Sequence, residues 1–205
     1  MVLVYNELFK INRENPTIVT WVSLVKSLLY RIGFGYYWEQ QCVFNESYFL
    51  SIFKQRIYDI YLQEWSANVD ITSDNRLYKH IKDKFCFEGY LNLSNKCLRN
   101  SITKIRLSSH VFMIERGRWN RNIPNVLNRK CISCNTIEDE YHCMVVCPRF
   151  TKERKGCLPD ILKRRPSMHE FLKFIKDKNE ASQIKLGLLA FRILKEYKNN
   201  LFDNE

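Results

Sequence analysis

The chain has 205 residues, of which 45% are hydrophobic and 14% aromatic, and its formal net charge is +11. A chain this long and this apolar can bury one or two cores, which excludes a mainly disordered polypeptide. No apolar run approaches the ~20 residues that span a bilayer, and the first residues lack the pattern of a secretory signal. We therefore expect a folded protein of the nucleus or cytoplasm, without a membrane partner, whose eight cysteines stay reduced.

Apolar residues recur at intervals of three and four along most of the chain, which predicts an all-α protein. The first stripe covers residues 21–29 and ends before the glycines of Gly33-Phe34-Gly35. Asn45 is suited to cap a long helix whose apolar face continues to Trp65. Ser73 opens a shorter helix that reaches Phe85.

The second half of the chain continues the helical pattern. A helix begins near Leu98, and we place its end near Gly117. A further helix is expected over residues 151–163. The segment Ser167-Met168-His169-Glu170 matches a capping box and predicts another helix after it, and the last helix covers residues 184–194.

Pro124 to Asn128 is the expected joint between two parts of the protein. We expect a helical domain with a basic carboxyl-terminal edge over residues 1–123. Residues 124–205 are then predicted to form a small Cys-Cys-His-Cys zinc-binding segment followed by C-terminal helices.

Four residues form a Cys-x2-Cys-x7-His-x4-Cys array, namely Cys131, Cys134, His142 and Cys147. The two-residue gap suits a tight metal-binding turn, and the later two ligands lie far enough downstream to complete a tetrahedron around Zn²⁺. A closed tetrahedron leaves no water to activate, so the predicted zinc is structural rather than hydrolytic. Cys143 adjoins His142 and could compete for the ion on a helix.

Positive charge is concentrated just before this array. Residues 96–130 carry nine basic side chains against Glu115 alone, whereas residues 1–95 carry ten basic and ten acidic ones. Such a local surplus is typical of contact with a polyanion, most often RNA or DNA. The alternative is a solvated helix face with structural ion pairs, and His110 could equally cap or orient within the core. The predicted nucleic-acid-binding residues are Arg106, His110, Arg116, Arg118, Trp119, Arg121, Arg129 and Lys130.

Several short strings in this region together resemble a known family. They are Arg106-Leu107-Ser108-Ser109-His110, Glu115-Arg116-Gly117-Arg118, Arg129-Lys130-Cys131-Ile132-Ser133-Cys134, Ile137-Glu138-Asp139-Glu140-Tyr141-His142 and Cys147-Pro148-Arg149-Phe150. They resemble the zinc-binding region at the C-terminal end of reverse transcriptases from LINE-type, non-LTR retrotransposons. Upstream strings such as Gln55-Arg56-Ile57-Tyr58-Asp59 resemble the segment that precedes this region.

The resemblance implies an RNA-directed DNA polymerase that copies its own RNA at a nicked chromosomal site. This chain lacks a Tyr-x-Asp-Asp-like carboxylate pair and a nuclease-like cluster, so it corresponds to the C-terminal piece, and we expect no enzyme activity. The family pattern also favours an inward-packed Cys143. The expected function is a nucleic-acid-binding zinc module that helps to hold RNA template or target DNA. The alternative is a protein-interaction or structural scaffold domain, which could dock on a polymerase domain.

Overall fold

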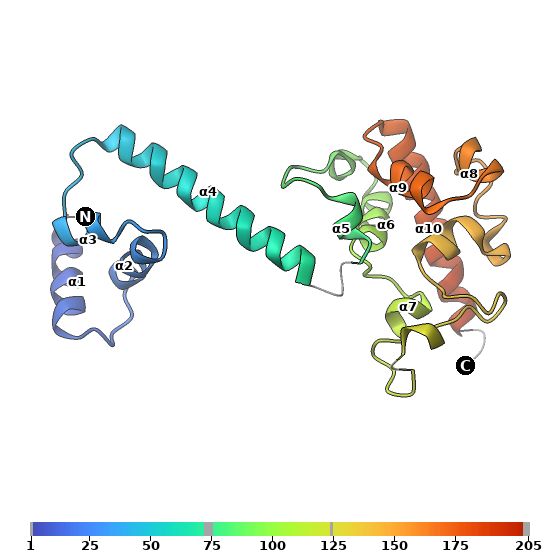
Figure 1. Cartoon of the computed structure of the whole chain (residues 1–205), viewed down its shortest axis with the longest axis horizontal. Helices are drawn as coiled ribbons and strands as arrows, with labels where there is room; N and C mark the ends of the chain where they lie inside the picture. Colours follow the sequence, from blue (N-terminus) through green and yellow to red (C-terminus); the bar gives the residue numbers. More distant parts are fainter. Residues whose placement is uncertain (1, 72–75, 124, 203–205) are drawn as a thin grey trace. The chain divides into compact units, whose positions relative to one another are not determined.

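The computed structural model describes residues 2–71, 76–123 and 125–202 (Figure 1). Within these ranges the protein is all-α, as the apolar periodicity predicts, and it contains no β-strand. The one extended pairing that the structure describes is an isolated antiparallel bridge between Lys130 and Ile137. In the described ranges, no helix is long and apolar enough to cross a lipid bilayer.

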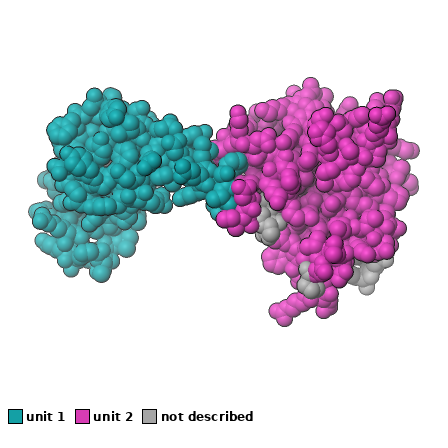
Figure 2. Space-filling model, viewed as in Figure 1, with its two compact units in different colours: residues 1–68 teal, residues 69–205 magenta. Residues whose placement is uncertain are grey.

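The chain forms two compact units, residues 1–68 and 69–205 (Figure 2). The boundary predicted between residues 123 and 124 was wrong, because it lies inside the second unit. Helix α6 (Lys96–Arg106) packs directly on α10 (Glu180–Phe202), so both sides of the predicted joint share one core. Gly187 permits this close approach, since a Cβ there would lie 2.8 Å from Leu98 Cβ.

The first unit consists of helices whose starts follow simple capping chemistry. Thr20 and Ser23 form a capping box at the start of α2, and Asn45 accepts a 3.0 Å hydrogen bond from the Tyr48 amide, as its position predicts. Val22 and Trp38 are buried, whereas Trp21 is 49% exposed. The helices of this unit are α1 (Val2–Glu14), α2 (Trp21–Arg31), α3 (Gly35–Gln40) and most of α4 (Glu46–Ile71).

The buried apolar residues of the second unit form a single hydrophobic cluster among the described residues. Phe112, Phe150 and Phe171 come from three separate segments and are fully buried beside α10 residues such as Ile193. Its remaining elements are α5 (Tyr78–Ile81), η2 (Gly89–Asn92), α7 (Met113–Arg116), η3 (Val126–Asn128), η4 (His142–Val146), η5 (Pro148–Phe150), α8 (Asp160–Arg164) and α9 (Met168–Lys176).

Three predicted helix bounds were wrong. Helix α5 ends at Ile81 and does not reach Phe85, and its predicted opening residue Ser73 lies outside the described residues. Helix α6 ends at Arg106 rather than near Gly117, because Ser108 adopts a left-handed conformation with φ of 50° that interrupts the helix. Residues 151–157 form turns, so α8 is much shorter than the predicted helix.

The carboxyl-terminal helices follow their predicted signals more closely. The Ser167 hydroxyl accepts a 3.2 Å hydrogen bond from the Glu170 amide and caps α9. Helix α10 includes the whole predicted stretch of residues 184–194. Helix α10 is the longest element of the second unit, and its apolar residues belong to the same buried core as Cys131 and Cys147.

Candidate metal centre

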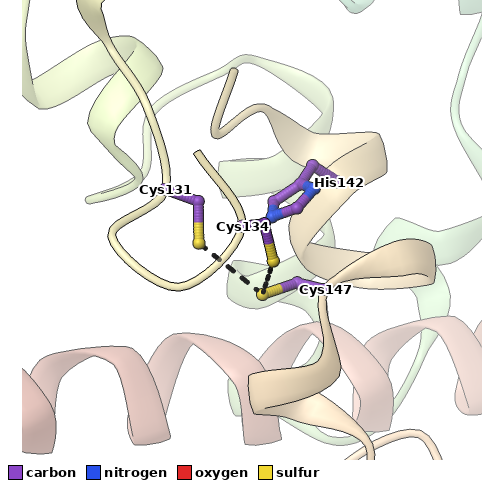
Figure 3. A group of neighbouring side chains, drawn as sticks. All are labelled: Cys131, Cys134, His142 and Cys147. Atoms are coloured by element: carbon purple, nitrogen blue, oxygen red, sulfur yellow. Dashed lines mark hydrogen bonds between the residues drawn. The ribbon is translucent and has the colours of Figure 1, made fainter. Parts of the chain in front are cut away.

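Cys131, Cys134, His142 and Cys147 come together in the second unit (Figure 3). One potential ligand atom from each residue lies within 4.8 Å of the others. The Cys147 sulfur is 3.8 Å from the Cys131 sulfur and 3.9 Å from the Cys134 sulfur. With metal–sulfur bonds of about 2.3 Å, a regular tetrahedron has edges of about 3.8 Å, so the sulfur spacing suits tetrahedral coordination. The four side chains can therefore hold one metal ion.

A tight turn positions the first two cysteines. The Cys131 amide donates to the Thr136 carbonyl at 2.8 Å, and the Asn135 amide donates back to the Cys131 carbonyl at 2.9 Å. Asn135 has a φ of 53°, a left-handed conformation that asparagine tolerates better than most residues. The turn points both sulfurs to the same side (Figure 3).

A π-helical turn positions the other two ligands. In η4 the Cys147 amide donates to the His142 carbonyl at 2.7 Å, which closes a ring one residue wider than that of an α-helix. In an α-helix, residues five apart point in clearly different directions, since each turn takes about 3.6 residues. The wider turn instead brings His142 and Cys147 to one side. The local backbone departs from the α-helix at the point where two ligands must converge.

The His142 ring fits the role of a neutral nitrogen ligand. Its Nδ1 lies 3.2 Å from the Thr136 hydroxyl, whereas its Nε2 is buried and has no hydrogen-bond partner among the described residues. A buried ring nitrogen without a partner is costly unless something else coordinates it. The Thr136 contact also fixes the ring orientation, as partners of metal-bound histidines commonly do. The geometry therefore assigns Nε2 as the ligand atom.

Burial shapes the protonation of the ligands. It lowers the pKa of His142, which favours the neutral imidazole that metals require. Burial also raises the pKa of Cys147 to about 12 and raises that of Cys134. Without a cation these thiols hold their protons, so metal binding must displace protons from sulfur.

Cys143 packs inward, as the family pattern favours. Its side chain is fully buried in the core, and it is not one of the four converging ligands. Burial raises the pKa of its thiol well above the ordinary value. Cys143 therefore acts as a small apolar residue of the core.

Glu138 and Arg154 anchor the ligand-bearing segment through contacts that could not be predicted from the sequence. Glu138 accepts hydrogen bonds from the Met113 amide, Arg149 and Tyr197. Arg154 donates to the carbonyls of Cys143, Met144 and Cys147, which lie in or just after η4. These contacts satisfy carbonyls at the end of the π-helical turn and hold it against the core. Met113 and Tyr197 are 25 and 59 residues from Glu138 in sequence, and Arg154 reaches η4 from a turn rather than along one helix.

Glu140 lies at the centre of a second buried network. Its carboxylate accepts hydrogen bonds from Ser108 at 2.7 Å, from His110 at 3.0 Å and from Arg76 at 2.8 Å. Burial on its own raises the pKa of Glu140, but the bonds and charges of His110, Arg76 and Ser108 lower it to about 2. The carboxylate therefore stays ionised inside the protein.

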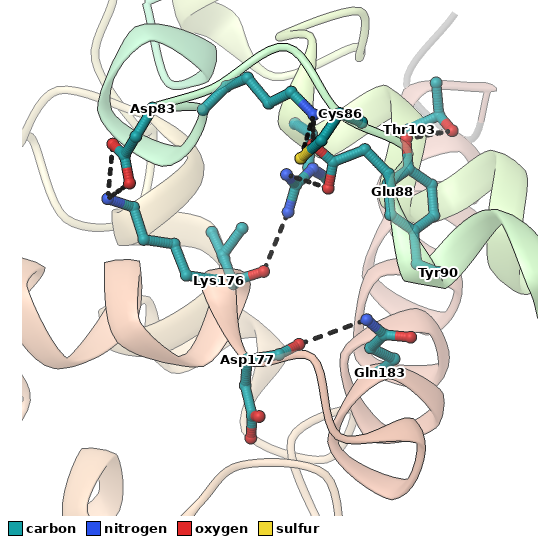
Figure 4. Close-up of polar contacts among 11 residues, drawn as sticks. Asp83, Cys86, Glu88, Tyr90, Thr103, Lys176, Asp177 and Gln183 are labelled. Carbon is teal, nitrogen blue, oxygen red and sulfur yellow. Dashed lines mark hydrogen bonds and ion pairs between the residues drawn. The ribbon is translucent and has the colours of Figure 1, made fainter.

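Three of the predicted nucleic-acid-binding residues have structural roles instead. Arg106 is only 5% exposed, and its guanidinium donates hydrogen bonds to the Glu88 carboxylate and to the Ile175 carbonyl. Figure 4 shows the polar contacts around Glu88. The His110 ring bonds to Glu140 through Nε2 and accepts the Phe112 amide at Nδ1. Arg129 is 8% exposed and donates to the Ile114 carbonyl. Those three predictions were wrong, because burial and internal partners remove these groups from solvent phosphates.

The other five predicted residues reach the surface of the second unit. Arg116, Trp119, Arg121 and Lys130 are exposed, and the indole of Trp119 is 86% exposed. Arg118 is partly exposed and forms a 3.1 Å ion pair with Glu115. Lys130 directly precedes the first cysteine ligand. The structure thus leaves a smaller cationic surface than the charge count implies, with one exposed aromatic ring in it.

Comparison with known proteins gives no match to a family model, to a curated protein or to a solved structure.

Proposed function

We propose that the metal centre binds a structural Zn²⁺ ion. Three sulfur ligands and one imidazole nitrogen form a set that zinc favours over magnesium or calcium, which prefer oxygen. All four positions of a tetrahedron are supplied by the chain, which leaves no open position for a substrate. Bound zinc stabilises the fold of residues 131–147, and apparent binding energies of roughly 10–16 kcal/mol are typical of such sites.

We further propose that the protein is a nucleic-acid-binding zinc module, similar to the C-terminal part of non-LTR retrotransposon reverse transcriptases. One observation carries this proposal: exposed cations and an exposed indole lie in the segments just before the zinc ligands. Arg116, Arg121 and Lys130 offer charge to phosphates, and Trp119 offers a ring face to an unpaired base. A rigid zinc segment keeps Lys130 in place, because Cys131 is itself a ligand.

Filter binding across a salt series tests this function. We expect the zinc-loaded protein to bind single-stranded RNA, duplex DNA or a nicked duplex, with an affinity that falls steeply as salt rises. The log-log slope should be about −0.7 for each phosphate contact on a single strand. A slope near zero, or no binding to any of the three probes, refutes the proposal.

Two variants separate contact from folding. Replacing Arg116 and Arg121 with alanine should weaken binding while zinc content and melting temperature stay unchanged, since both side chains are exposed. Cys134→Ser should lower zinc content, stability and binding together. A Cys134→Ser protein that keeps its zinc and its affinity contradicts the link between metal and binding.

The first unit supports a second candidate, a protein-interaction scaffold. Trp21 is 49% exposed, Tyr36 61% and Tyr48 62%, although aromatic side chains usually contribute to cores or interfaces. A zinc-loaded protein that binds no nucleic acid favours this function over the first. A partner such as a polymerase domain should then protect these rings from solvent, which tryptophan fluorescence of Trp21 can detect.

A further inference from the structure

Two adjoining hollows on the second unit each combine one exposed aromatic ring with basic side chains. The first, which we call the lysine hollow, has a volume of about 370 Å³ and includes Lys104, Phe191, Lys195 and Lys198 in its lining. The second, the arginine hollow, has a volume of about 400 Å³ and includes Arg116, Arg118 and Trp119. Both volumes fall within the range of roughly 300–1,000 Å³ that ligand pockets occupy.

The two hollows share a border. Ser109, His110 and Val111 line both of them. Ser109 is exposed, so its hydroxyl can contact a ligand. Both nitrogens of the His110 ring already form hydrogen bonds, one with Glu140 and one with the Phe112 amide. The hollows therefore form one continuous surface rather than two unrelated pockets.

Helix periodicity explains the lysine hollow. Phe191, Lys195 and Lys198 are spaced by four and three residues on α10, so they lie on one helix face. Lys104 faces them from the adjoining helix α6. None of the residues that line this hollow is acidic, and none of its three lysines forms an ion pair within the described part of the chain.

The arginine hollow also has excess positive charge. Its one acidic lining residue is Glu115, which is 8% exposed and already pairs with Arg118 at 3.1 Å and with Arg76 at 3.6 Å. Arg116 is exposed, and its guanidinium makes a weak 4.0 Å contact to the Met113 sulfur. Across both hollows the uncompensated charge is positive, so the surface favours an anionic ligand.

We propose that the two hollows together bind a single-stranded nucleic acid, with bases stacked on Phe191 and Trp119 and phosphates held by the lysines and by Arg116. This inference rests on the proposed nucleic-acid-binding function and extends its surface to α6 and α10. Phe191 is 38% exposed and Trp119 86%. A ring stacks only on a base whose face is open, and the base faces of a duplex are covered by their neighbours, so the surface suits a single strand.

Fluorescence anisotropy with the full, zinc-loaded chain tests this inference. The probes are oligo(U) RNA, oligo(dT) DNA and a DNA duplex, each about 12 nucleotides long, within the ~4–16-nucleotide footprint typical of single-strand modules. The first variant is Lys195→Ala with Lys198→Ala. The matched control is Lys178→Ala with Lys185→Ala, because these exposed lysines lie outside both hollows and their removal changes the net charge equally.

We expect the Lys195 and Lys198 variant to lose about 1.4 of the log-log salt slope on single strands, at about 0.7 for each lost contact. The control pair should retain the full slope. Phe191→Leu keeps most of the apolar volume and removes the ring, and it should weaken single-strand binding by about fivefold or more, the low end of the effect of losing one stacked base. Unchanged melting temperatures for these variants exclude a folding defect.

Other outcomes distinguish this inference from the proposed function. If the wild type binds single strands but both lysine pairs lower affinity equally, the hollows are not the site, and the proposed function stands. If the duplex binds as tightly as the single strands, the stacking assignment is wrong. Equal competition by polyglutamate overturns a nucleic-acid ligand for this surface. If the folded, zinc-loaded protein binds no probe, the proposed function fails as well.

Discussion

Tyr197 donates a 2.5 Å hydrogen bond to the carboxylate of Glu138, a residue 59 positions earlier in the chain. Tyr197 is on α10 and 3% exposed, and Glu138 lies between the two halves of the metal centre in sequence. Burial and the Glu138 contact raise the pKa of the Tyr197 phenol, so it stays a donor at all ordinary pH values. The bond thus fastens the ligand-bearing segment to the longest helix of the second unit.

Tyr197→Phe should destabilise the second unit by about 1–3 kcal/mol, because a buried carboxylate loses one of its donors. Urea unfolding followed by circular dichroism measures the change. Tyr36→Phe is the matched control, since Tyr36 is 61% exposed, and it should change stability by less than about 0.5 kcal/mol. Equal effects of the two substitutions contradict a structural role for the Tyr197 bond.

Removal of the metal should loosen the segment that carries the ligands. We expect one zinc per chain by atomic absorption, and we expect a chelator to lower the melting temperature. Cys42, Cys86 and Cys97 are exposed and should react with a thiol reagent in the zinc-loaded protein, whereas the ligand thiols should react only after chelation. Cys97→Ser should leave zinc content unchanged. If the ligand thiols of the zinc-loaded protein react as fast as the exposed ones, the four residues do not hold the zinc.

Acid should weaken the protein partly through Glu140. Its pKa is about 2 in the folded protein and 4.5 ordinarily, so its contribution is full above about pH 4.5 and is lost as the pH falls toward 2. Glu140→Gln should therefore cost on the order of 3 kcal/mol near neutral pH, and this difference should shrink below pH 4.5. Unfolding curves at several pH values measure it, and Glu180→Gln, at an exposed position, is the control. If the difference in unfolding free energy between Glu140→Gln and the wild type stays constant with pH, Glu140 does not cause the acid sensitivity.

Arg106 and Arg116 should respond in opposite ways to replacement by alanine. Arg106→Ala leaves the carboxylate of Glu88 with Lys82 as its remaining charged partner and should destabilise the protein by about 3–5 kcal/mol. It should leave the salt slope for nucleic-acid binding unchanged, provided the protein is assayed well below its melting temperature. Arg116→Ala should lower the slope and leave stability unchanged. The reverse pattern contradicts the assignment of Arg106 to the interior.

The metal centre could be predicted from the sequence because its signal is local. The gap between Cys131 and Cys134 and the type of the later ligands carry the chemistry without reference to the rest of the fold. The all-α class followed in the same way from the apolar period. The end of α6 could not be predicted, because Ser108 interrupts the helix without a glycine or proline nearby to mark the break.

The charge count could not tell which basic residues reach the surface. Arg106 and His110 meet Glu88 and Glu140, which are distant in sequence, so their burial depends on tertiary pairing. The lysines of α10 were missed for the opposite reason. Residues 131–205 carry fourteen basic and eleven acidic side chains, and this near balance conceals the local gathering of Lys195 and Lys198 beside Lys104.

The π-helical turn limits how chains of this kind can vary in length. His142 and Cys147 meet because the wide turn spans five residues. Deleting one residue between them gives a four-residue separation, which an ordinary α-turn can also present on one side. Adding one residue gives a separation that neither turn accommodates. Evolution of this segment should therefore accept a deletion far more readily than an insertion, whatever the identities of the residues between the two ligands.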